Sequence, residues 1–146
     1  MPKSRTRNFW SAVAGTAAIE FAFLALPFAG VTTAAFEAGR AAWTLEALQD
    51  SAIQGARCIG VAASSCYSSG AFSSTSAVAH IQSVAQAWGV TIPASAVTAT
   101  QDTSCGSIPG FSEVRISYTF SSVAGTLIPA LSSVPLSASA CFPHNS

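Results

Sequence analysis

The sequence predicts an α+β fold with a long N-terminal transmembrane helix, a second short helix and a small three-stranded antiparallel sheet. Residues 16–36 are apolar with one exception. Small or apolar residues then recur every three or four positions, which is the period of a helix. Beyond Gly89 the period changes to two, which is typical of half-buried strands. A sheet with one face covered by the helices accounts for all three observations.

The apolar segment 16–36 is long enough to cross a membrane. At about 1.5 Å per residue it spans about 30 Å as a helix, which matches the hydrocarbon core of a bilayer. Its only ionisable residue is Glu20, and a charge in lipid costs about 2.5–3.5 kcal/mol or more. Three basic residues and no acid precede the segment: Lys3, Arg5 and Arg7. The positive-inside rule therefore places the N-terminus in the cytoplasm and residues 37–146 outside.

Composition supports one small domain attached to a membrane segment. Of the 146 residues, 50% are hydrophobic and only 8% are charged, against about 25% charged residues in soluble domains. The formal net charge is zero, and without residues 1–15 the chain becomes mildly acidic. With no basic patch, nucleic acid is not expected as a partner.

The residues before and after Glu20 follow a recognisable order. A short basic leader ends at Gly15, Thr16 follows, and Glu20 and Phe21 are the fifth and sixth residues after the glycine. This order resembles a class-IV prepilin processing site. Type II secretion pseudopilins and ordinary type IV pilins usually have a large apolar residue directly after the glycine, whereas this chain has Thr16.

A longer stretch resembles TadE-like minor pilins of the tight-adherence (Tad, or Flp) pilus systems. The resemblance runs through residues 17–22, Pro27, residues 36–40 and residues 45–57. It covers roughly residues 12–60, and the threonine after the glycine favours this branch of the pilins. It implies a pilin-like fold for the chain.

The resemblance also implies a function. It implies a basic prepilin leader at 1–15, a transmembrane helix at 16–36 and an extracytoplasmic α+β domain at 37–146. The expected protein is a minor pilin, or pseudopilin, cut after Gly15 by a prepilin peptidase and held in the inner membrane. It would contribute to pilus initiation and surface adherence. The expected partners are other pilins and minor pilins, the inner-membrane assembly platform and membrane lipid.

Glu20 has a structural role in this interpretation. The resemblance implies that its carboxylate pairs with the new amino terminus, at Thr16, of an adjacent subunit. An isolated acid in lipid independently requires a neutralising partner. The alternative is a protonated Glu20 that is satisfied within its own helix.

Two helices are expected. The first runs from about 12 to 60, with a kink at Pro27 and polar residues such as Thr44 outside its packed stripe. That stripe comprises Ala41, Leu45, Leu48, Ala52, Ala56 and Ile59. After a surface loop at 62–76, the second helix is capped by Ser74, Thr75 or Ser76 and ends at Gly89. Its own stripe, Ala77, Ile81, Val84, Ala85 and Trp88, is expected to pack on the first helix.

Three strands follow. Residues 113–120 and 134–141 alternate clearly between apolar and polar side chains, and 96–101 do so more weakly. Turn-rich segments at 102–112 and 125–133 connect them, so the strands should form an antiparallel meander.

Four cysteines on the outer side favour disulfides. The meander brings Cys105 and Cys141 to the same edge of the sheet. The short segment between Cys58 and Cys66 is expected at the other end of the domain. We therefore expect the pairs Cys58–Cys66 and Cys105–Cys141 among the three possible pairings.

No catalytic, metal or cofactor site is expected, and the protein is not expected to be an enzyme. His80 is expected to be a surface or packed residue, and His144 to lie in a terminal tail. Asp102 and Glu113 flank a loop and are expected to be a solvated pair, with a cation site as the alternative. Neither the serines nor the cysteines have the spacing of a hydrolase or zinc motif. The aromatic residues Phe28, Phe36 and Trp43 are expected to face lipid or neighbouring helices.

Two other classes of protein remain open from the sequence. One is an uncleaved single-pass periplasmic adaptor of a secretion or pilus machine. The other is a secreted, disulfide-stabilised binding module released by signal peptidase near 33–35. Two features argue against the secreted module. Glu20 lies in the middle of the supposed signal sequence, and the helical pattern continues beyond the supposed cleavage site.

Overall fold

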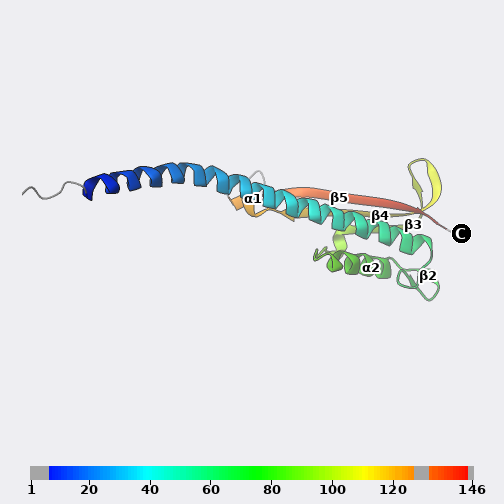
Figure 1. Cartoon of the computed structure of the whole chain (residues 1–146). Coiled ribbons are helices and arrows are strands. Elements are labelled where there is room, and N and C mark those ends of the chain that lie inside the picture. Colours follow the sequence, from blue (N-terminus) through cyan, green and yellow to red (C-terminus); the bar gives the residue numbers. More distant parts are fainter. Residues whose placement is uncertain (1–6, 127–131, 145–146) are drawn as a thin grey trace, which may run out of the picture. The chain divides into compact units, whose positions relative to one another are not determined.

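The computed structural model describes residues 7–126 and 132–144. The chain divides into two compact units, an N-terminal unit at Met1–Ala38 and a head domain at Gly39–Ser146. One long helix, α1 (Arg7–Gly60), contributes to both units (Figure 1). The expected α+β architecture, with a long N-terminal helix, a short helix and a three-stranded antiparallel sheet, is confirmed.

The N-terminal unit contains the first part of α1. The helix begins at Arg7, earlier than expected, so it includes residues 7–15 of the expected leader. It continues through Pro27, although the proline has no N–H to bond the carbonyl four residues earlier. Two threonine hydroxyls donate to carbonyls one turn back, Thr32 to Phe28 and Thr33 to Ala29, at 2.8 Å each. Their polar groups are therefore satisfied inside the helix.

The head domain contains a sheet with strand order β3-β4-β5: β3 (Val97–Cys105), β4 (Ile108–Ser121) and β5 (Ser133–Pro143). All neighbouring pairs are antiparallel, and Val114 lies opposite both Ala99 and Ala140. The expected turn at 102–112 is much shorter, because the strands extend to a two-residue hairpin turn at Gly106 and Ser107. The expected connection at 125–133 falls partly on 127–131, which lies outside the described residues.

The segment expected as a surface loop at 62–76 contains a small hairpin. Strand β1 (Tyr67–Ser68) pairs with β2 (Ala71–Phe72). Ser69 and Gly70 form the turn with φ values of 54° and 81°, the left-handed geometry that two-residue hairpins favour. Such short strands carry too few residues to show an alternating pattern in the sequence.

The second helix, α2 (Ser74–Ala87), lies beside the sheet and α1. Ser73, and not one of the three residues expected, caps it: its hydroxyl accepts from the backbone N–H of Ser76 at 3.2 Å. The helix ends at Trp88 and Gly89, where the glycine has a φ of 78°. Three residues of the expected stripe are fully buried in the core: Ala77, Ile81 and Ala85.

The core lies between the two helices and the inner face of the sheet. The expected stripe of α1 supplies Leu48, Ala52, Ala56 and Ile59. The prediction that Thr44 lies on the polar side of α1 is wrong, because its side chain is buried. The Thr44 hydroxyl can be buried because it donates a hydrogen bond to the carbonyl of Arg40 at 2.9 Å.

Close packing fixes the direction of α1 within the head domain. The Arg40 guanidinium lies 5.4 Å from the centroid of the Phe120 ring, near the start of β5. Farther along α1, a Cβ at Gly55 would approach Val114, and one at Gly60 would approach Phe142. This part of α1 therefore runs in the same direction as β5.

Candidate functional site on the apolar helix

The four residues of the expected processing site lie on α1. Gly15, Thr16, Glu20 and Phe21 are all exposed. Thr16 and Glu20 are four residues apart, so they share one face of the helix.

The helix around Glu20 exposes an unusual amount of apolar surface. Its large apolar side chains are each 61% exposed or more: Ile19, Phe21, Phe23, Leu24, Leu26, Phe28, Val31 and Phe36. Within the described residues, one helix is long and apolar enough to cross a membrane, in the range Gly15–Gly60. An exposed apolar surface of this size indicates contact with lipid or other proteins.

Gly15 is not required by the packing of the chain. A Cβ at this position would meet nothing within 4 Å. Glycine inside a helix is about 0.5–1 kcal/mol less favourable than alanine. The packing of the described residues therefore does not explain why this position is a glycine.

The head domain contains two disulfides, Cys58–Cys66 and Cys105–Cys141, with Cα–Cα distances of 6.0 and 6.3 Å. These are the two pairs chosen from the sequence. The prediction that Cys58 lies at the opposite end of the domain is wrong. Gly60 packs against Phe142, so both disulfides lie near the same end, where α1 and β5 terminate.

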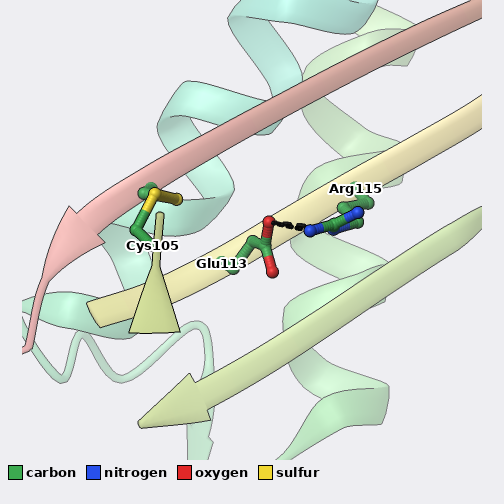
Figure 2. Close-up of polar contacts among 4 residues, drawn as sticks. Cys105, Glu113 and Arg115 are labelled. Atoms are coloured by element: carbon green, nitrogen blue, oxygen red, sulfur yellow. Dashed lines mark hydrogen bonds and ion pairs between the residues drawn. A yellow bond between two sulfur atoms is a disulfide. The ribbon is translucent and has the colours of Figure 1, made fainter. Parts of the chain in front are cut away.

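The Cys105–Cys141 bond joins strands that are not neighbours, because β4 lies between β3 and β5. Cys141 is opposite Glu113, whereas Cys105 pairs with Ile108 much nearer the hairpin turn. Cys105 reaches Cys141 because the pairing of β3 with β4 is irregular between Thr100 and Cys105. Figure 2 shows Cys105 beside the Glu113–Arg115 pair on β4.

Backbone geometry locates this bend in the hairpin. Asp102 on β3 has a φ of 54° and Gly110 on β4 has a φ of 83°. Such left-handed residues interrupt a regular ladder and mark a bulge. The end of the β3–β4 hairpin leaves the plane of the sheet in Figure 1. In the sequence, Asp102 and Gly110 are the residues that could indicate this bend. Their positions alone do not predict it.

His144 was expected in a terminal tail, but it is held at this end of the head domain. Its backbone N–H donates to the carbonyl of Gly110 at 2.8 Å, and its Nε2 lies 3.0 Å from the Gln101 amide nitrogen. Gln101 also donates to the Tyr67 hydroxyl, which donates to the carbonyl of Ile59. This chain of contacts ties the end of α1 to β3 and to the residue after β5.

Other charged and polar side chains contact one another within the head domain. Arg115 donates to Glu113 at 2.8 Å on the sheet surface (Figure 2). The Asp50 carboxylate accepts from Trp88 Nε1 at 2.9 Å and from Gln54 at 2.8 Å. Among the described residues, no group of three His, Cys, Asp or Glu side chains could hold a metal ion. A surface hollow of about 300 Å³ beside α2 is lined by residues without charge: Ala79, Gln82, Ser83, Gln86, Thr91 and Ile92.

The long N-terminal helix is apolar over residues 16–36, where Glu20 is the one carboxylate, and it continues into a small α+β domain. The model of the family described as TadE-like protein matches residues 15–57. This confirms the resemblance over that segment, which is less than a third of the chain and begins at Gly15. Over this segment the chain is similar to TadE-like proteins. Neither the comparison with curated proteins nor that with solved structures found a match.

Proposed function

We propose that this protein is a minor pilin of a Tad-type pilus that helps to initiate and assemble the filament and so contributes to surface adherence. A prepilin peptidase cuts the leader 1–15 after Gly15. The segment 16–36 holds the protein in the inner membrane, with residues 37–146 outside. The protein acts by helix packing with other pilins and with the assembly platform, without catalysis.

The observation that carries this proposal is the position of Glu20 on α1. It is the only ionisable residue in the exposed apolar segment 16–36, which lies within the TadE-like match over residues 15–57. A carboxylate among lipid chains is costly unless a neighbouring group neutralises it. The amino group created at Thr16 by cleavage would supply that charge from an adjacent subunit.

Glycines on the same helix support packing against other helices. A Cβ at Gly15, Gly30 or Gly39 would meet nothing within 4 Å, so none of the three is required for packing within the chain. In membranes, small residues allow helices to approach closely. Exposed glycines on an apolar helix therefore favour assembly with other helices.

The processing step is tested by the intact mass of the protein recovered from membranes. The expected mass corresponds to a chain that starts at Thr16. Gly15→Leu should leave the leader attached, because the scissile position requires a small residue. Gly30→Leu is the matched control: it is another exposed glycine of the same helix, and the variant should still be processed.

The same mass measurement distinguishes the proposed pilin from the two other classes of protein. A full-length mass in the presence of the peptidase would support an uncleaved single-pass adaptor. A start at Ala35 or Phe36 would indicate a secreted module. That result would require cleavage inside α1, which is helical through both residues.

A further inference from the structure

One end of the head domain exposes side chains that suit a membrane surface. Trp43 is 56% exposed, and Val123 after β4 is 63% exposed. Arg40 is also exposed, and its guanidinium lies 5.4 Å from the centre of the Phe120 ring, three residues before Val123. We call Arg40, Trp43 and Val123 the basal patch.

The basal patch lies at the end of the head domain where α1 enters it. Arg40 and Trp43 follow Phe36 by four and seven residues along the continuous helix α1. These separations correspond to about 6 and 10 Å of helix rise. The headgroup layer occupies about 5–8 Å on each side of the hydrocarbon core. Arg40 therefore falls within this layer, and the Cα of Trp43 lies about 2–5 Å beyond it, with its Cβ directed back toward the N-terminal end of the helix.

The chemistry of the patch fits lipid headgroups. Tryptophan is enriched at membrane interfaces because its ring is apolar and its N–H is polar. Here the Trp43 N–H donates to the backbone carbonyl of Trp88 at 3.1 Å, and the two rings meet edge to face with centroids 5.1 Å apart. This contact holds the exposed ring in place. Arg40 is the first basic residue after Arg7 and complements the charge of lipid phosphates.

We propose that the basal patch rests on the phospholipid headgroups of the membrane that α1 enters. This inference rests on the proposed membrane anchor and adds a second contact to it. The end of the sheet, and not only the helix, would touch lipid. The head domain would then keep a fixed orientation on the membrane before it is incorporated into a filament.

The test compares the two ends of β4. The full chain is placed in phosphatidylcholine–phosphatidylglycerol nanodiscs with its three tryptophans changed to phenylalanine. V123W or I108W then adds one tryptophan. Val123 and Ile108 are matched, at 63% and 62% exposed, and they lie at opposite ends of the strand. Headgroup spin-labelled lipid should quench the fluorescence of V123W, and aqueous iodide should quench that of I108W.

A second pair of chains tests α1. With Trp10 and Trp88 changed to phenylalanine, native Trp43 remains, and its hydrogen bond survives because the acceptor is the backbone carbonyl of residue 88. The control replaces Trp43 with phenylalanine and carries I53W, farther along α1 at a site 57% exposed. Trp43 should be quenched by the lipid and I53W by iodide. Arg40→Gln should weaken lipid quenching of V123W more with phosphatidylglycerol present than in phosphatidylcholine alone.

Three results would overturn the proposal. Iodide quenching of V123W together with lipid quenching of Trp43 would mean that the helix alone lies near the membrane. Protection of V123W from both quenchers would mean that protein, not lipid, covers Val123. Equal lipid quenching of V123W and I108W would mean that the head domain has no fixed orientation. Failure of the chain to enter nanodiscs at all would instead refute the membrane anchor of the proposed function.

Discussion

Individual residues divide into those that the fold requires and those that it does not. Gly55 and Gly15 illustrate the difference. A Cβ at Gly55 would lie 2.5 Å from Ile81 Cγ1 and 3.3 Å from Val114 Cγ2, whereas one at Gly15 would meet nothing within 4 Å. The first glycine allows α1 to approach α2 and β4. The packing of the described residues does not require the second, and Glu20 is exposed as well.

Gly55→Ala should therefore destabilise the head domain relative to Gly39→Ala. Both changes favour the helix by about 0.5–1 kcal/mol, but only Gly55→Ala forces a methyl group into the core, at a cost of about 1–3 kcal/mol. Ile81 is fully buried and cannot move aside freely. Denaturant unfolding in detergent measures the difference, and equal stability of the two variants would contradict the close packing at Gly55.

Glu20→Ala should insert into the membrane more readily, by about 2.5–3.5 kcal/mol on insertion scales. It should nevertheless fail to cross-link to neighbouring pilins or to support piliation, because the carboxylate that pairs with Thr16 is missing. Glu46→Ala is the control, since it removes an exposed acid of α1 outside the apolar segment. Normal numbers of pili in the Glu20→Ala strain would exclude the pairing role, whatever its processing.

At the level of elements, the two disulfides secure different parts of the head domain. Cys58–Cys66 joins the last turns of α1 to the loop before β1, across 8 residues of sequence. Cys105–Cys141 spans 36 residues and holds the bent end of the β3–β4 hairpin against β5. The longer loop removes more entropy from the unfolded chain.

Loss of Cys105–Cys141 should consequently destabilise the domain more than loss of Cys58–Cys66. The chain-entropy relation gives about 4 kcal/mol for the first bond and about 2.5 kcal/mol for the second. Unfolding of the C105S/C141S and C58S/C66S variants under oxidising conditions measures both values. After full reduction, wild type and variants should converge. A larger loss in C58S/C66S would show that the bent hairpin gains little from its cross-link.

At the level of the whole molecule, the two units contain different kinds of residue. The buried apolar core lies in the head domain, with contributions from α1, α2 and the sheet. The described part of the N-terminal unit contributes no residue to this core and exposes its large apolar side chains. Folding of the head domain should therefore depend on α1 only from Gly39 onward.

A fragment comprising residues 39–146, secreted into an oxidising compartment, should fold by itself. It retains every residue of the core, so it should unfold cooperatively and show both disulfides by peptide mapping. A fragment comprising 61–146 is the control. It lacks the buried α1 residues Ala47, Leu48, Ala52, Ala56 and Ile59, and it should remain unfolded. A molten 39–146 fragment would mean that the head domain needs the apolar segment or the membrane.

The sequence alone determined the elements and the character of the apolar segment. Helix and strand periods are local properties, so α1, α2 and the three strands were predictable, although α1 and β4 each begin five residues before the expected start. The lone Glu20 in an apolar segment after Gly15 was equally visible, because its significance depends on composition and order. The short β1–β2 hairpin was not predictable, since two-residue strands carry no period.

Only the tertiary structure decided how these elements meet. The sequence could not give the direction of α1 along the sheet, because that depends on the contacts of Gly55 and Gly60 with α2, β4 and β5. The correct disulfides were chosen although Cys58 was placed at the wrong end. The anchoring of His144 by Gly110 and Gln101 and the contact of Arg40 with Phe120 likewise involve residues far apart in sequence. Such contacts follow from packing across elements, which no local pattern encodes.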